Sequence, residues 1–354
     1  MSRRRIAGLA LVAVASALAL AACQRRTQLV AVGSDSTGVA SDSFSIRVRQ
    51  MQQLWDEPAA GIDGAKLSAE LLREDLAAHP DQPWPSRTRA LLDSLDLGAE
   101  ITADARVVVV NFFSRAHPEG GSWPWLFWPV AKGGAGARAL SGQGLQLLQV
   151  ASRPRSGDVR SVAVLFGRRA ATGQTPMLMV WNDLVKPAAE PAQILGPDSL
   201  GGAGSASFES GTDSTIALVS RTYRGVPRFE ECATCPHVYT VRRFVWDGPQ
   251  FHKTEEHSIP SPYSSFVQFV SALVAQDLDR EFRYVSDPTV VDAAKRYELD
   301  MVARGAWRVA PATDESADRM TFFRGQTEAY QVSFTPRGDD WIITSIVPTQ
   351  RTVE

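Results

Sequence analysis

The sequence predicts an α+β protein in which N-terminal helices pack on a mainly antiparallel β domain, followed by a small helix-then-sheet α+β domain. Three observations lead to this fold class. Apolar residues recur at helical spacing over residues 44–97. β-branched and aromatic runs separated by turn residues fill residues 101–256, and a second helical stripe from residue 266 precedes alternating strands. Helices and strands that are segregated along a chain are typical of α+β folds.

The totals indicate an ordinary globular protein of about two domains. The chain has 354 residues, of which 44% are hydrophobic and 21% charged, and its formal net charge is -2. Nucleic acid is not an expected partner, because the chain has no strong basic field.

The first residues have the pattern of an export signal. Three arginines at positions 3–5 precede an apolar run over residues 6–20, and two alanines follow it. A charged start, a short apolar run and small residues before a cleavage site define such a signal, and the run is short for a membrane span. Residues 1–22 are therefore predicted to be a signal peptide.

The end of this signal resembles the lipobox of bacterial lipoproteins, with the residues Leu20-Ala21-Ala22-Cys23. The resemblance implies cleavage before Cys23, acylation of its sulfur and acylation of the new amino terminus. Two or more acyl chains hold a protein firmly to a bilayer. A plain secretory signal or a single membrane anchor are the alternatives. The expected location is the bacterial cell envelope, facing outside the cytoplasm, with the membrane as partner through the acyl chains on Cys23.

Residues 23–43 are predicted to form a lipidated tether. Small polar residues dominate residues 33–38 and 41–43 and bury too little apolar surface to fold. In many lipoproteins the residue after the lipidated cysteine bears on sorting. Gln24 is not the aspartate that favours inner-membrane retention in enterobacteria, which slightly favours the outer membrane if the cell has one.

Residues 44–257 are predicted to form one domain, a helical lead-in followed by antiparallel strands. Helices are expected over residues 44–55, 65–78 and 87–95, with Ser86 capping the third helix and Gly98 ending it. Strands are expected at Arg106–Phe113, Val159–Phe166, Met177–Trp181, Ile216–Val219 and Val238–Trp246. The tryptophan-rich stretch Ser122–Pro129 is expected to be buried core, since aromatic side chains dominate cores. The alternative is an exposed row of aromatic rings that binds a sugar or a peptide. Trp246-Asp247-Gly248 resembles the blade-end turns of some propeller-like proteins, but no convincing second copy is found.

The Pro/Ser stretch at residues 258–262 is the predicted boundary before an α+β domain over residues 263–354. One helix is expected along an apolar stripe comprising Phe266, Phe269, Val270, Leu273, Val274, Leu278 and Phe282. A second helix is expected over residues 289–303. Strands at residues 320–323, 330–334 and 341–347 follow, the last two joined by a hairpin at residues 336–340.

This order of helix, helix and strands, with the hairpin before Asp340-Trp341-Ile342-Ile343, resembles the nuclear transport factor 2-like superfamily, which includes ketosteroid-isomerase-like and SnoaL-like proteins. The resemblance implies a sheet curled around a long helix, often with an apolar pocket. Members include enzymes and binding or accessory modules. In the isomerase-like members an aspartate acts as base, and none of Asp277, Asp279 and Asp300 matches that position.

Cys232 and Cys235 are predicted to form a disulfide, because they are an even pair in an exported protein. Covalent haem is disfavoured, since Pro236 occupies the place of the required histidine. A thioredoxin-like redox pair is an alternative, although the acidic residues 230–231 disfavour a thiolate.

A structural zinc site is another alternative for the same cysteines. Cys232, Cys235, His252 and His257 have spacings near those of a Cys2His2 site, and His237 could replace one ligand. The gap before His252 is longer than in the usual finger. The prediction is accordingly a disulfide, with no metal and no cofactor.

No catalytic residue is predicted. The acidic pairs at residues 230–231 and 339–340 fit solvated loop charges, and the glycines of residues 201–204 lack the Lys-Ser/Thr ending of a phosphate loop. The favoured function is a lipid-anchored cell-envelope protein that binds or scaffolds an unknown envelope protein or small ligand. The alternative is an envelope enzyme, a hydrolase or isomerase, with its site in the C-terminal pocket.

Overall fold

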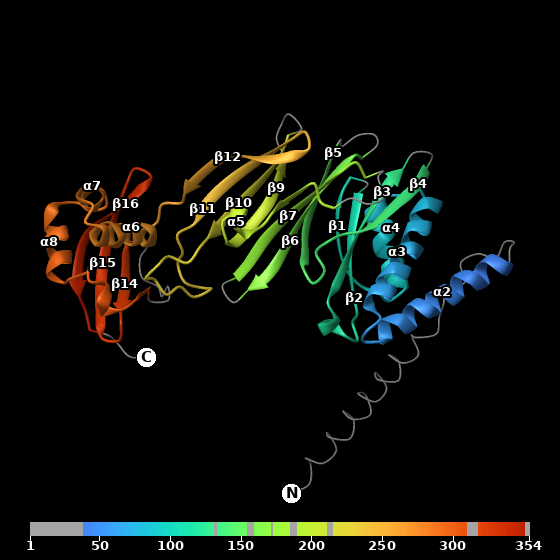
Figure 1. Cartoon of the computed structure of the whole chain (residues 1–354), viewed down its shortest axis with the longest axis horizontal. Coiled ribbons are helices and arrows are strands. Elements are labelled where there is room, and N and C mark those ends of the chain that lie inside the picture. The colour runs from blue at the N-terminus through green and yellow to red at the C-terminus, as the bar shows by residue number, and fades with distance from the viewer. Residues whose placement is uncertain are drawn as a thin grey trace, which may run out of the picture. The chain divides into compact units, whose positions relative to one another are not determined.

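The protein is described by a computed structural model over residues 38–105, 107–130, 133–153, 159–170, 173–184, 190–210, 215–309 and 318–350. The predicted signal peptide, Cys23 and the tether as far as residue 37 lie outside these residues. The chain divides into two units, Met1–Arg49 and Gln50–Glu354. Helix α2 (Gly38–Asp56) runs through this division, and all other described elements belong to the second unit (Figure 1).

Helix α2 overlaps the last residues of the predicted tether, and the tether itself stays a prediction. The helix begins at Gly38, before the predicted start at Phe44. Linker composition was the basis of the prediction, yet short polar residues such as Ser and Asp are common near the start of a helix, where their side chains can accept from free backbone N–H groups.

Helices α3 (Gly61–Ala78) and α4 (Trp84–Ser94) cover one face of the first sheet. Helix α4 begins earlier than predicted. Its N-cap is Pro83 rather than Ser86, because Pro85 is tolerated in the first turn, where its missing N–H has no intrahelical partner. Gly98 does not cap this helix but opens the next strand.

Among the residues that the structure describes, the middle of the chain forms three successive four-stranded antiparallel sheets, in each of which strands adjacent in sequence pair with each other. Sheet A comprises β1 (Gly98–Asp104), β2 (Val107–Phe113), β3 (Ser122–Val130) and β4 (Gly134–Ala139). Sheet B comprises β5 (Gln146–Arg153), β6 (Ser161–Ala170), β7 (Gly173–Asn182) and β8 (Gln193–Leu195). Sheet C comprises β9 (Ala203–Ser210), β10 (Ile216–Tyr223), β11 (Thr240–Asp247) and β12 (Gln250–Ser258), with the short helix α5 (Pro197–Leu200) before it.

The same meander is therefore repeated, although the sequence shows no repeat. Propeller blades have this four-stranded order, and sheets A to C fall short of the roughly four to eight blades of a closed propeller. The repeat is one of backbone topology. The three sheets differ in amino-acid sequence, and each packs against different elements of the chain.

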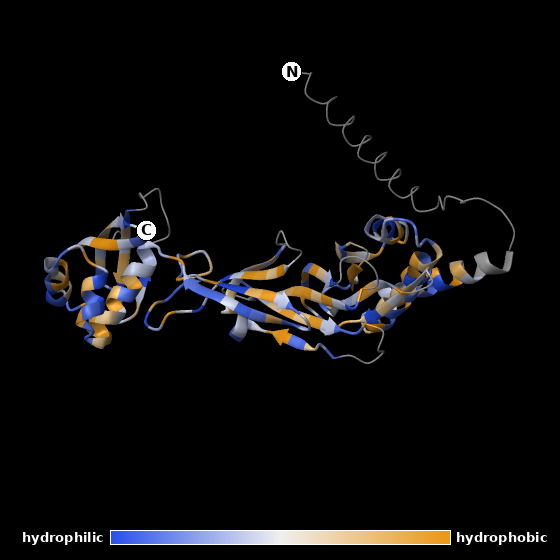
Figure 2. Cartoon of the chain, turned by 90° about the horizontal axis from the view of Figure 1, so that it is seen from above, coloured by the Kyte–Doolittle hydropathy of each residue, from blue (hydrophilic) through white to orange (hydrophobic). Residues whose placement is uncertain are grey.

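Sheet B lies between the other two, which explains its composition. One of its faces joins a core with sheet A that includes Val164, Phe166 and Trp181. Its other face joins a core with sheet C that includes Leu165 and Val180. A strand that is buried on both faces carries an uninterrupted apolar run rather than alternation, and apolar residues run along these strands in Figure 2.

Polar side chains link the sheets at their edges. Asp104 of sheet A accepts from the backbone N–H of Ser152 at 2.7 Å. The amide of Gln193 in sheet B forms two hydrogen bonds with the backbone of Phe251 in sheet C, donating to its carbonyl at 2.9 Å and accepting from its N–H at 2.7 Å. These side chains satisfy edge groups that would otherwise need water.

Helices and a fourth sheet complete the chain. The helices are α6 (Pro262–Ala275), α7 (Leu278–Arg283) and α8 (Pro288–Arg296), with a 3-10 turn, η4 (Val302–Arg304), after them. Sheet D comprises β13 (Trp307–Val309), β14 (Arg319–Arg324), β15 (Glu328–Arg337) and β16 (Asp340–Pro348). We refer to α6–α8 with sheet D as the C-terminal unit.

The predicted long helix over residues 266–282 is divided in the structure. Ser261 and Ser264 form a capping box that starts α6, and Gln276 ends the helix with φ of 55°. Leu278 and Phe282 then lie on α7 and are 56% and 45% exposed. The apolar stripe was extended too far because the break at Gln276 carries no Gly or Pro signal.

The tryptophan-rich stretch is only partly buried, since Trp128 lies in the core while Trp123 and Trp125 are half-buried. The contact of Trp123 with α3 can be tested. A Cβ placed on Gly61 would lie 2.0 Å from Cη2 of Trp123, whereas a Cβ on Gly120 would meet nothing closer than 3.9 Å. The helix can approach the sheet only because Gly61 has no side chain.

We predict that Gly61→Ala lowers the free energy of unfolding by about 1–3 kcal/mol, the usual cost of overpacking. Gly120→Ala is the matched control and should change it by less than about 0.5 kcal/mol. Urea unfolding of both variants measures the difference, and equal effects would contradict the packing described.

Candidate functional site

The segment between β10 and β11, residues 224–239, leaves sheet C and enters the C-terminal unit. We call it the junction loop. Its Phe229 is buried in the core of that unit, where its ring stacks on Trp307 with centroids 6.4 Å apart. Tyr263 and Phe266 of α6 meet the same ring edge-on at 6.1 and 6.4 Å. Phe229 therefore comes from a loop between two strands of sheet C, but its side chain packs in the core of the C-terminal unit.

Backbone hydrogen bonds hold the junction loop beside β13. The N–H of Trp307 donates to the carbonyl of Arg228 at 2.7 Å, and the N–H of Glu230 donates to the carbonyl of Trp307 at 2.8 Å. The two chains form a parallel bridge at Phe229 and Trp307. The loop therefore extends sheet D by a short stretch, which covers the free edge of its three-residue end strand.

A disulfide joins Cys232 and Cys235 in the middle of this loop, with the two Cα atoms 5.0 Å apart. The N–H of Cys235 also donates to the carbonyl of Cys232 at 3.0 Å, which closes a turn. So small a ring contributes only about 2 kcal/mol of chain entropy. The bond therefore fixes a local turn rather than distant elements.

The zinc alternative is not what the structure shows at these cysteines. Their sulfurs are bonded to each other, while His252 and His257 lie exposed on β12. His252 pairs with Asp247 at 3.0 Å. Over the residues that are described, no group of three or more His, Cys, Asp or Glu side chains is placed to hold a metal ion.

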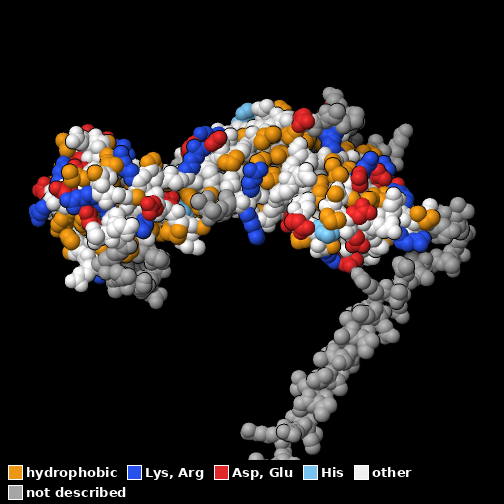
Figure 3. Space-filling model, turned by 60° about the horizontal axis from the view of Figure 1, so that its bottom comes forward, with side chains coloured by type: hydrophobic (Ala, Val, Ile, Leu, Met, Phe, Trp, Pro, Cys, Tyr) orange, Lys and Arg blue, Asp and Glu red, His pale blue; other side chains and the backbone are white. Residues whose placement is uncertain are grey.

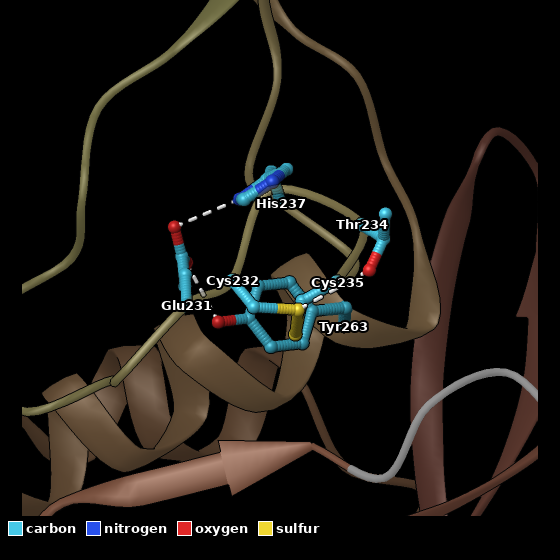
Figure 4. The surroundings of a disulfide bond; sticks show 6 residues. All are labelled: Glu231, Cys232, Thr234, Cys235, His237 and Tyr263. Carbon is cyan, nitrogen blue, oxygen red and sulfur yellow. Dashed lines mark hydrogen bonds and ion pairs between the residues drawn. A yellow bond between two sulfur atoms is a disulfide. The ribbon is translucent and has the colours of Figure 1, made fainter. Parts of the chain in front are cut away.

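A buried carboxylate lies beside the disulfide and joins two elements. Glu231 accepts from the hydroxyl of Tyr263 at 2.7 Å and from Nδ1 of His237 at 3.0 Å (Figure 4). The side chains of Glu231 and His237 are only 5% and 1% exposed. Burial, followed by the bond to Glu231, raises the pKa of Tyr263 well above its ordinary value. We call Glu231, His237 and Tyr263 the clasp.

Two tyrosines enclose the imidazole of the clasp. Tyr223, the last residue of β10, stacks on His237 with centroids 3.5 Å apart, and Tyr239 meets it edge-on at 5.9 Å. The guanidinium of Arg221 lies 4.7 Å from the Tyr239 ring. Burial, with Tyr239 and Glu231 nearby, raises the pKa of Tyr223.

The clasp resembles a catalytic arrangement only in part. A carboxylate that orients a histidine is one half of a general base, but a base must reach the proton it removes. His237 is sealed between tyrosine rings, and its Nε2 atom makes no hydrogen bond to the described residues. The geometry fits a structural tie that joins the junction loop to α6.

Local sequence patterns do not predict the positions of the clasp residues. The sequence predicts that Glu230 and Glu231 are both solvated loop charges, but only Glu230 is exposed, with its carboxylate 3.6 Å from the guanidinium of Arg308. The sequence offers His237 only as an alternative zinc ligand, and no local pattern predicts a role for Tyr263. The contacts depend on the loop entering the C-terminal unit, and no local motif signals that path.

Several aromatic side chains pack against one another in the core of the C-terminal unit. Phe266 stacks on Phe322 at 3.8 Å and meets Trp307 edge-on at 5.2 Å. The buried guanidinium of Arg324 donates from Nη1 to the carbonyl of Glu298 at 2.7 Å, and burial lowers its pKa. The alternative of an enzyme with a site in a C-terminal pocket stays a prediction.

The aspartates considered for that pocket do not form a site either. Asp277 accepts from the backbone N–H of Arg280 at 3.2 Å and caps α7. Asp279 is exposed on the same helix, and Asp300 is half-buried after α8.

Comparisons with known proteins do not assign the chain to a family. No family model matches the chain, and no curated protein matches its sequence. One solved structure is similar over part of the chain, an acylaminoacyl peptidase in complex with Z-Gly-Gly-Phe-chloromethyl ketone. The match has a TM-score of 0.26 and 8% identity, and covers 73% of this chain but 39% of that one.

We predict that Phe229→Ala lowers the free energy of unfolding by about 3–5 kcal/mol, because it empties a site in a packed core. Phe282→Ala is the matched control on the exposed face of α7 and should cost less than about 1 kcal/mol. Urea unfolding followed by circular dichroism compares them. A mild effect of Phe229→Ala would show that the loop does not depend on this anchor.

We predict that Tyr263→Phe costs about 1–3 kcal/mol at pH 7, because the buried carboxylate of Glu231 loses a donor. The variant should also change the response to alkali. The raised pKa of Tyr263 means that the unfolded chain releases this proton near pH 10 while the folded chain keeps it, so stability falls as the pH rises above 10.

Without that hydroxyl, the slope of stability against pH above 10 should be shallower by up to about 1.4 kcal/mol per pH unit. Chemical unfolding at a series of pH values measures both effects. Identical slopes in the native protein and Tyr263→Phe would mean that the hydroxyl is not held as described.

Proposed function

We propose that this protein is a lipid-anchored component of the bacterial cell envelope with a binding or scaffolding role. The observation that carries the proposal is the sequence Leu20-Ala21-Ala22-Cys23 after a basic and apolar start. Acyl chains on Cys23 would hold the protein at the membrane, facing outside the cytoplasm.

The state of the ionisable groups supports binding over catalysis. Glu231, His237 and Tyr263 bond to one another in a sealed clasp. Other buried charges are also paired within the fold, such as Glu281 with Lys295 at 3.0 Å. A site for chemistry needs a reactive group that a substrate can reach, and these groups serve the fold instead.

We further propose the domain arrangement that the sequence predicts. The N-terminal helices and sheets A to C form a body up to residue 257. Residues 263–354 form a smaller α+β domain whose layout resembles the nuclear transport factor 2-like superfamily. The junction loop qualifies this division, because Phe229 belongs by sequence to the first part and by packing to the second.

The partner is proposed to be an envelope protein or a small ligand. On the face drawn in Figure 3, basic and acidic side chains are interspersed, which offers no single-sign field for nucleic acid. Among the described helices, none has both the length and the apolar character to cross a bilayer.

We predict that cells expressing the full chain incorporate labelled palmitate into it, and that Cys23→Ala abolishes the incorporation. Cys232→Ser is the matched control and should leave it unchanged. Mass spectrometry of the N-terminal peptide should find Cys23 as the first residue, carrying acyl chains. An unmodified terminus at Cys23, or labelling that survives Cys23→Ala, would refute lipid anchoring.

A further inference from the structure

The two ends of the Cys232–Cys235 disulfide lie in different surroundings. Cys232 is exposed, as are Ala233 and Thr234 beside it. Cys235 is half-buried and packs against the core of the C-terminal unit. An external thiolate can therefore approach the sulfur of Cys232, while that of Cys235 is sheltered. Exposed disulfides are the ones that exchange readily with thiols.

Because the ring is small, its opening should cost the fold little stability. Only residues 233–234 lie between the cysteines, so opening the ring adds little chain entropy to the unfolded state. The turn has its own hydrogen bond, from the N–H of Cys235 to the carbonyl of Cys232 at 3.0 Å. The two sulfurs therefore stay on one turn and can bond again.

Both ends of the ring lead directly into the clasp. Glu231 precedes Cys232, and His237 follows Cys235 with only Pro236 between them. The closed ring thus holds the turn that places the carboxylate of Glu231 3.0 Å from Nδ1 of His237 (Figure 4). With the ring open, the backbone on each side gains freedom and the clasp loses its preorganisation.

We propose that Cys232 is a thiol-exchange site and that a dithiol reductant, acting there, loosens the junction loop from the C-terminal unit. This inference goes beyond the proposed binding role and does not depend on lipidation. The carboxylates of Glu230 and Glu231 oppose a thiolate on the chain itself. The chain is therefore the substrate of the exchange and not its catalyst.

The dithiol supplies both electrons that reduce the disulfide, so the reaction needs no other reductant. Its thiolate attacks Sγ of Cys232, the bond to Cys235 breaks, and the Cys235 thiolate takes a proton from water. The second thiolate of the reagent then attacks the mixed disulfide and releases Cys232 as a thiol. The reagent is oxidised to a disulfide, and the protein gains two cysteine thiols.

The test uses the full chain with Cys23→Ser, purified in detergent, so that only Cys232 and Cys235 react. Dithiothreitol is added without denaturant, and alkylation followed by mass spectrometry counts the free thiols. Hydrogen exchange is then compared between the oxidised and reduced states. We expect full reduction, with exchange over residues 228–239 at least tenfold faster and exchange of β6 amides unchanged.

Two further measurements complete the test. Glutathione, a monothiol at limiting concentration, should be trapped on Cys232 rather than Cys235. The double variant Cys232→Ser/Cys235→Ser should show the fast exchange whether or not dithiothreitol is present. The proposal is overturned if the bond resists reduction until urea is added, if glutathione is found equally on Cys235, or if reduction leaves exchange in the junction loop unchanged.

Discussion

The burial of Phe229 in the core of the C-terminal unit is the contact on which the other features of the site depend. Its ring stacks on Trp307 and meets two aromatic rings of α6, so the junction loop must cross from sheet C to reach it. Burying an aromatic side chain in this way is worth several kcal/mol, far more than the small ring of the disulfide contributes. Once the loop is anchored, Glu231 is brought to Tyr263, and His237 is brought to Glu231.

The polar side chains of the clasp hold the junction loop in place after Phe229 has anchored it. A buried carboxylate is costly unless its oxygens are bonded, and here a hydroxyl and an imidazole satisfy them. These hydrogen bonds fix the conformation of the junction loop and do not expose a reactive group. Similar use of polar side chains recurs between the sheets, where Asp104 and Gln193 satisfy backbone groups of neighbouring strands.

Local signals in the sequence predict a good part of this fold. The α+β class, the apolar stripe of α6, strands β6 and β7 of sheet B and the hairpin before β16 all follow from periodicity and turn residues. The disulfide follows from an even pair of cysteines in a chain that is predicted to be exported. The break at Gln276 and the start of α2 are missed, because neither carries a strong local signal. The clasp is missed for a different reason. Glu231 looks like a solvated charge until Phe229 carries it into another unit, and that contact is long-range.

Native-state hydrogen exchange in increasing urea tests most directly whether the junction loop joins sheet C and the C-terminal unit into one cooperative structure. Amides of β10 and β11 would be followed together with amides of β14 and β15. The account predicts that the slowest amides of both sheets converge on the same opening free energy, because the loop must leave its core before either sheet can open alone. Separate opening of β14 and β15 at a clearly lower free energy, with β10 and β11 still protected, would contradict it.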